Sequence, residues 1–144
     1  MMESDTIQLL RECDAGIKMG VESIDEVLEY VNDSTLRKYL TEGKSDHEKL
    51  KEEIQVLLDR YKDDGKEPNP MAKGMSWVKT NMKLVMKESD QTIAALITDG
   101  CNMGVKSLNR YLNRYEAADQ KTKDITKKLI HIEERLAEDI REYL

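Results

Sequence analysis

The sequence predicts an all-α protein, a four-helix bundle made of two helical hairpins that are joined by one long crossover. Apolar residues recur at steps of three and four in four segments, which is the spacing of an amphipathic helix. The chain has no Phe, one Trp and two Pro, and 36% of its residues are charged, a composition that favours helices over strands. Landmarks of the first half also recur in the second half. The length of 144 residues suits a single domain, which we expect to span residues 1–144.

The first hairpin is expected over about residues 4–62. Ser4 and Asp5 can cap a helix that should run to about residue 31. A polar turn follows, and its last residue, Ser34, can cap the second helix. Because this link is short, the two helices should be antiparallel. The second helix carries one apolar stripe that includes a histidine: Leu36, Leu40, Gly43, His47, Leu50, Ile54, Leu57 and Tyr61.

The crossover is expected over about residues 63–87. Gly65, Pro68 and Pro70 end the preceding helix. A short extra helix should follow, and its apolar face, which includes Trp77, is expected to dock on the bundle. A link of this length can cross helices that are ~40 Å long at 1.5 Å per residue. The second and third long helices are therefore expected to be parallel.

The second hairpin is expected over about residues 88–144 and repeats landmarks of the first. Residues 3–5 recur as residues 88–90, and the glycine pair at Gly16 and Gly20 recurs at Gly100 and Gly104. Because an interior Gly costs ~1 kcal/mol relative to Ala, these pairs indicate a packing requirement. We expect close helix packing, within the fold or in a dimer. Room for a bulky neighbour or a ligand is the alternative.

Charge and cysteine content limit the partners and the compartment. The net charge of -6 repels phosphate backbones and anionic lipids, so we expect neither nucleic acid nor membrane as a partner. The sequence starts without a signal-peptide pattern, and no apolar stretch approaches the roughly 18 residues of a membrane span. We therefore expect a cytoplasmic protein. In that reducing compartment Cys13 and Cys101 should be buried free thiols.

The order of the predicted elements, together with two sequence segments, allows a comparison with a known family. The duplicated hairpin, a crossover reading AKGMSWVKTNMKL and a last helix reading LIHIEERLAEDIREYL together resemble the bacterial ferritin-like, rubrerythrin-like domains of unknown function. The resemblance covers nearly the whole chain. For the wider superfamily it implies a carboxylate-bridged di-iron or di-manganese centre, which takes a Glu from two helices and a Glu-x-x-His from the other two.

The chain departs from that ligand pattern. Lys44 and Lys128 stand three residues before the two histidines, and Lys106 stands at the position that matches Glu22. We therefore do not expect di-iron oxidase or ferroxidase chemistry.

His47 and Glu133 are the main candidates for a functional site. His47 lies on the apolar stripe and should point inward, whereas His131 should face solvent. Alignment of the two hairpins places Glu133 at the position of His47, so the two side chains are expected to meet at mid-bundle. His47, Glu133 and Asp25 are the candidate ligands of a metal ion. A hydrogen-bonded core histidine is the simpler interpretation.

No nucleophile with a base, phosphate-binding loop or zinc-type cluster occurs in the sequence, so we expect no catalytic residue. We also expect no cofactor, with a metal ion as the alternative. The leading hypothesis is a non-catalytic bundle that acts through self-association, as a homodimer, or by binding a protein partner. Its packing residues would be Gly16, Gly20, Gly100 and Gly104. The alternative is a metal-binding bundle with a degenerate ferritin-like site for iron, manganese or zinc, in a redox or storage role.

Overall fold

The computed structural model describes residues 2–67 and 89–144, and within these ranges the chain is helical with no strand. The prediction of an all-α four-helix fold is confirmed. The extra helix expected in the crossover, including Trp77, lies outside the described residues. The helices are α1 (Met2–Leu28), α2 (Ser34–Arg60), α4 (Asp90–Arg114) and α5 (Gln120–Asp139), followed by the short 3-10 helix η1 (Arg141–Tyr143).

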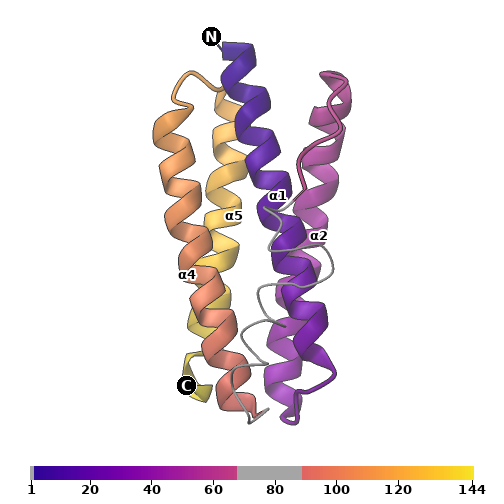
Figure 1. The fold of residues 1–144 in the computed structure, drawn as a ribbon, viewed down its shortest axis with the longest axis vertical. Helices are drawn as coiled ribbons and strands as arrows, with labels where there is room; N and C mark the ends of the chain where they lie inside the picture. The colour runs from indigo at the N-terminus through magenta and orange to yellow at the C-terminus, as the bar shows by residue number, and fades with distance from the viewer. Residues whose placement is uncertain (1, 68–88) are drawn as a thin grey trace.

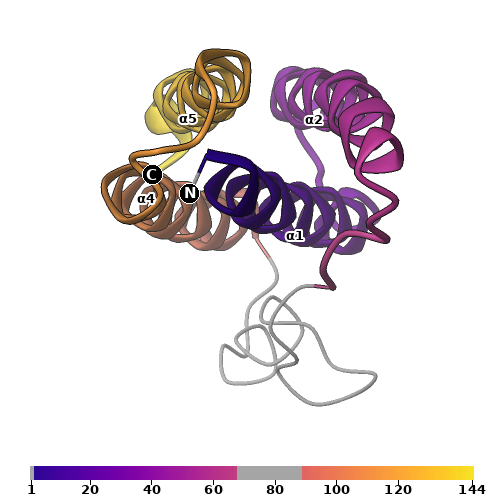
Figure 2. The same cartoon turned by 90° about the horizontal axis from the view of Figure 1, so that it is seen from above.

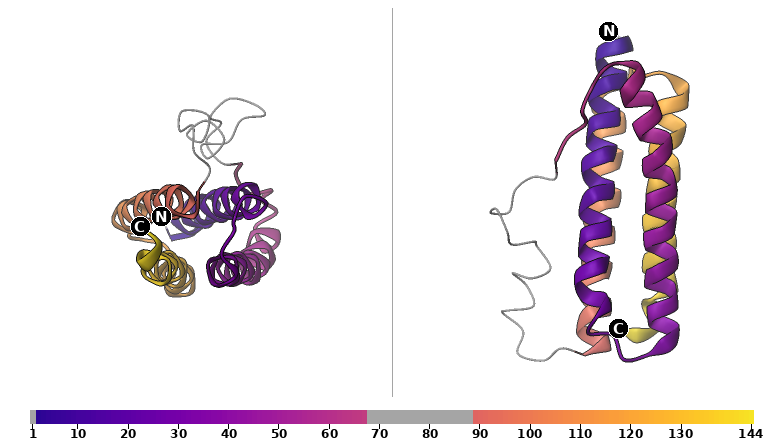
Figure 3. Two further views of the ribbon diagram at one scale, coloured as in Figure 1. Left: turned by 90° about the horizontal axis from the view of Figure 1, so that it is seen from below. Right: turned by 90° about the vertical axis from the view of Figure 1, so that its right-hand side faces the viewer.

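The four helices lie in two layers, with α1 beside α4 in one layer and α2 beside α5 in the other (Figure 2). The view from below and the side view in Figure 3 show the same arrangement. Within each hairpin the two helices are antiparallel (Figure 1). Each of α1 and α5 contacts its own hairpin partner and both helices of the other hairpin, because α1 and α5 also touch across the bundle.

The starts of α2 and α4 lie at the same end of the bundle. The backbone N–H groups of Asn32 and Asp33 donate to the Asp90 carboxylate at 2.8 and 2.9 Å. These bonds join the turn before α2 to the first residue of α4. The two helices are thus parallel, as the sequence predicted (Figure 1).

The helix boundaries correct two sequence predictions. Helix α1 begins at Met2 and ends at Leu28, so the predicted cap at Ser4 and Asp5 is wrong. The Asp5 carboxylate instead accepts the N–H of Ala117 in the turn between α4 and α5, at 3.0 Å. The cap of α2 is Asp33 rather than Ser34, because the Asp33 carboxylate accepts a hydrogen bond from the backbone N–H of Leu36.

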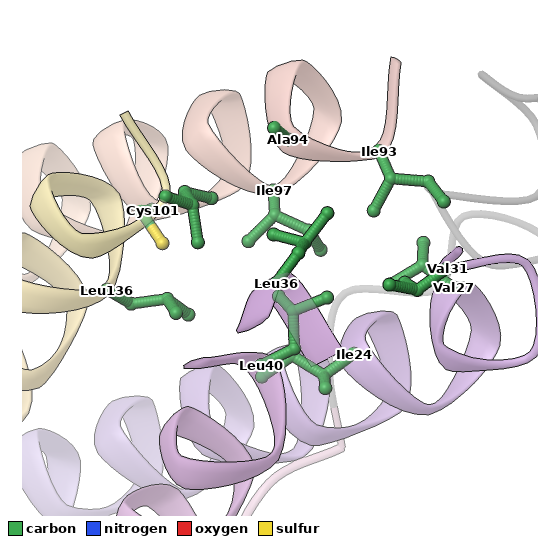
Figure 4. Close-up of a cluster of buried hydrophobic side chains, with 11 residues drawn as sticks. Ile24, Val27, Val31, Leu36, Leu40, Ile93, Ala94, Ile97, Cys101 and Leu136 are labelled. Carbon is green, nitrogen blue, oxygen red and sulfur yellow. The ribbon is translucent and has the colours of Figure 1, made fainter. Parts of the chain in front are cut away.

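Two apolar clusters fill the two ends of the bundle. The cluster near the turn between α1 and α2 is shown in Figure 4 and contains Ile24, Val27, Val31, Leu36, Leu40, Ile93, Ala94, Ile97, Cys101, Leu136 and Ile140. The cluster at the other end contains Leu10, Cys13, Ile17, Leu50, Ile54, Leu57, Leu58, Leu108, Ile125, Leu129 and Ile130. Burying one such Leu or Ile contributes roughly 1.5–3 kcal/mol, so these clusters stabilise the fold.

Candidate functional site

A buried His–Glu pair lies between the two apolar clusters. His47 on α2 is 1% exposed and Glu133 on α5 is 8% exposed. The Nε2 atom of His47 lies 2.7 Å from Oε1 of Glu133, and its Nδ1 lies 2.7 Å from the carbonyl oxygen of Gly43. A carbonyl oxygen only accepts, so Nδ1 carries a proton, and one further proton is shared between Nε2 and the carboxylate. The predicted meeting of His47 and Glu133 is confirmed, and both ring nitrogens are engaged.

Opposing effects set the protonation of His47. Burial lowers its pKa, but the hydrogen bond to Glu133, the charge of that carboxylate and the bond to the Gly43 carbonyl together outweigh burial. The pKa of His47 is therefore raised above its ordinary value. The pair accordingly favours an imidazolium beside a carboxylate, which leaves it with no net charge.

The two cysteines are free and buried, as the sequence predicted. Burial, the charge of Glu133 and a hydrogen bond to that carboxylate raise the pKa of the Cys101 thiol. Burial also raises the pKa of Cys13 to about 12, and its sulfur lies 3.2 Å from the Thr126 hydroxyl. Because a thiolate is the reactive form of cysteine, neither thiol is set up as a nucleophile.

A groove of about 570 Å³ opens between α1 and α4 beside the His–Glu pair. We call it the α1–α4 groove. Its length along α1, from Glu12 to Ile24, is ~18 Å at 1.5 Å per residue. The inner part of the groove reaches the buried pair and Cys101. Small residues and two methionines form much of its walls: Ala15, Gly16, Met19, Gly20 and Ser23 from α1, and Gly100, Met103, Gly104 and Ser107 from α4.

The glycines of the groove differ in what surrounds them. A Cβ atom at Gly20 would lie 2.9 Å from Nε2 of His47, so the fold requires glycine there. A Cβ atom at Gly104 would meet the Glu133 carboxyl carbon at 3.5 Å, and one at Gly16 would meet nothing closer than Leu129 at 4.0 Å. Both distances allow ordinary contact. The described fold therefore has a steric need for Gly20 but none for Gly16 or Gly104.

One end of the groove is bounded by the chain that follows α2. Gly65 has a φ of +83°, and a Cβ atom there would lie 2.2 Å from Oδ2 of Asp14. Only glycine allows this approach, which lets the Lys66 N–H donate to Asp14 at 3.1 Å. The Lys66 ammonium then pairs with Glu12 at 2.5 Å. Asp14 also pairs with Lys18 and is only 1% exposed. The sequence pattern did not predict that this carboxylate is buried.

Every charged side chain that lines the groove has a partner of opposite charge. Glu12 pairs with Lys66, Glu67 pairs with Lys18 at 3.2 Å, and Glu133 pairs with His47. Among the described lining residues no charge is left unpaired. The groove therefore offers apolar surface and neutral hydrogen-bonding groups.

Asp25 does not join His47 and Glu133, which corrects the predicted ligand set. Its neighbour Ile24 points into the core, so Asp25 faces outward, and its carboxylate pairs with Lys44 at 2.5 Å. His131 is exposed, as predicted. Within residues 2–67 and 89–144 no three His, Cys, Asp or Glu side chains are grouped so that they could hold a metal ion.

Comparisons with protein-family models, with curated proteins and with solved structures find no match for the chain. None of the described helices has the length and apolar character that crossing a membrane requires. The α1–α4 groove and the His–Glu pair are the features of the described residues that bear on function.

Proposed function

We propose that the protein is a non-catalytic ferritin-like four-helix bundle that acts by binding, through self-association or by holding a partner, and that the α1–α4 groove is its binding site. The parallel course of α2 and α4 and the matching glycine pairs on α1 and α4 support the ferritin-like layout and an internal duplication. The observation that carries the binding role is that Gly16 and Gly104 have no steric need in the described fold.

Glycine and open space both cost the fold stability. Each interior glycine costs ~1 kcal/mol relative to alanine, and the side chains that face a hollow lose dispersion contacts. Met19 and Met103 stand at the groove 37% and 53% exposed. Methionine is a flexible and polarisable side chain that suits adaptable binding surfaces. An occupant of the groove would give these side chains contacts that the described residues do not supply.

The polar groups of the site support binding rather than catalysis. A general base needs a free acceptor within reach of its substrate, but both nitrogens of His47 are engaged. The raised pKa of Cys101 keeps its thiol protonated. The His–Glu pair accordingly holds α2 and α5 together and forms part of the groove wall.

Native mass spectrometry tests this function by comparing the undenatured protein with the denatured chain. We expect the wild-type protein, purified without denaturant from cells that make it naturally, to carry extra mass from a second copy or from a bound partner, whether a protein or a small molecule. Gly104→Leu fills the groove and should give the mass of one bare chain. Asn102→Leu adds a leucine on the exposed side of the same helix and should behave like the wild type. A bare wild-type chain, or extra mass that Gly104→Leu retains, contradicts the proposal.

The second candidate is a metal-binding bundle with a degenerate ferritin-like site for iron, manganese or zinc. The contact between His47 and Glu133 favours it, although a metal ion on the His47 ring would have to displace Glu133 or the Gly43 carbonyl. Elemental analysis of protein purified without chelators separates the two candidates. Near-stoichiometric metal that is lost in His47→Ala supports the metal role, and metal-free protein rejects it.

A further inference from the structure

We infer that the α1–α4 groove binds an uncharged, elongated and mainly apolar small molecule. This inference rests on the proposed function and names the chemical class of the occupant. Three properties of the groove support it: the pairing of its charges, its shape and the kind of polar group that remains available.

The pairing of charges disfavours an ionic ligand, above all in the inner part of the groove beside Glu133. Within residues 2–67 and 89–144, the five charged residues that line the groove, Glu12, His47, Lys66, Glu67 and Glu133, are already in ion pairs. A carboxylate, phosphate or ammonium group would lose its hydration without gaining a partner, or would have to break an existing pair. Burying an unpaired charge costs several kcal/mol. An uncharged molecule avoids this cost.

The dimensions favour a narrow molecule. The groove follows α1 for ~18 Å at the helical rise of 1.5 Å per residue, yet its volume is about 570 Å³. This volume lies within the roughly 300–1,000 Å³ of small-molecule sites. A protein helix is ~10–12 Å wide with its side chains and would cover the groove from outside. A chain-like small molecule could instead reach the space beside Cys101 and Glu133.

The walls indicate which polar group such a molecule would carry. Glycine backbone, Ala15 and the thioethers of Met19 and Met103 form an apolar lining. Ser23 on α1 and Ser107 on α4 add one neutral hydroxyl group from each wall. A hydroxyl or carbonyl group on the ligand can bond to either serine without any change of charge. Long-chain alcohols are simple representatives of this class.

Fluorescence titration with N-phenyl-1-naphthylamine, an uncharged apolar probe, tests the inference. We expect saturable binding that 1-decanol displaces at least about tenfold more effectively than decanoate or decylammonium, a difference of about 1.4 kcal/mol. Gly104→Leu should weaken probe binding by about tenfold or more, whereas Asn102→Leu should leave it unchanged. A helical circular dichroism spectrum shows that each variant is folded. Gly16→Leu fills the groove from the α1 wall and should weaken probe binding in the same way.

Three results overturn the inference: no saturable probe binding, unchanged binding in both blocking variants, or equal competition by the charged compounds. Its failure can be told apart from failure of the proposed function. If native protein carries a second copy or a protein that Gly104→Leu loses, while the probe does not bind, only the ligand class is wrong. If the probe binds as expected but native protein carries no extra mass, the proposed function fails and the chemistry of the groove stands.

Discussion

The ends and the middle of this bundle are built on different principles. At each end, Leu and Ile side chains from several helices fill the core, and many of them are fully buried. In the middle, a neutral His–Glu pair and glycines adjoin a groove. The middle is less completely packed than the ends, and this difference is the physical basis of the proposed binding role.

The largest expected loss of stability comes from a substitution in the core at one end of the bundle. Leu36 is fully buried, and Leu36→Ala should lower the free energy of unfolding by about 4 kcal/mol, from lost transfer energy and the cavity it leaves. Met103→Ala, at the exposed rim of the middle, should change it by less than about 0.5 kcal/mol. Urea unfolding measures both. Similar losses in the two variants would show that the middle is packed like the ends.

The His–Glu pair is the main stabilising contact of the middle. His47→Leu or Glu133→Leu should each cost about 3 kcal/mol, because each leaves a buried polar partner unpaired. The double variant should lose clearly less than the sum of the two single losses, since neither unpaired group remains. Urea unfolding of the four proteins gives the coupling energy. Additive losses would mean that the two side chains do not interact.

The same pair predicts a pH dependence. The pKa of His47 is raised in the folded state, so its contribution to stability is complete below the unfolded pKa of about 6.5. This contribution should be lost as pH rises through the raised folded value. The gap in melting temperature between the wild type and His47→Gln should therefore narrow from pH 6 towards alkaline pH. A gap that widens over this range would contradict the assigned protonation.

The sequence predicts the ends of the bundle better than the middle. The stripe of α2 from Leu36 to Leu57 is buried throughout, because helical period alone determines which face is apolar. The meeting of His47 and Glu133 could also be predicted, from the register of the two hairpins. The groove could not, because its volume depends on how far apart α1 and α4 stand. The contacts of Asp14 and Asp25 could not be predicted either, because their partners come from other segments of the chain. Asp14 meets the chain at Gly65 and Lys66, and Asp25 pairs with Lys44 on α2.

A smaller effect separates the glycines of the middle. Gly20→Ala places a methyl group against His47, and we expect a net loss of about 1 kcal/mol after the helical gain of alanine is included. Gly43→Ala is a useful comparison, because its closest neighbour is the flexible end of Leu136 at 3.1 Å. It should lose less stability than Gly20→Ala. Thermal unfolding measures both losses. A larger loss in Gly43→Ala than in Gly20→Ala would show that the space beside His47 is not the tighter of the two.

The most direct test of the account is urea unfolding of the Gly16→Ala/Gly104→Ala variant, with and without N-phenyl-1-naphthylamine. Without the probe, the variant should be more stable than the wild type by about 1–2 kcal/mol, because alanine favours the helix and neither new methyl group comes closer than 3.5 Å to a neighbour. With the probe, it should gain less stability than the wild type does, because its groove is narrower. A variant that is less stable without the probe, or that gains as much from it, would contradict the claim that these two glycines serve an occupant and not the fold.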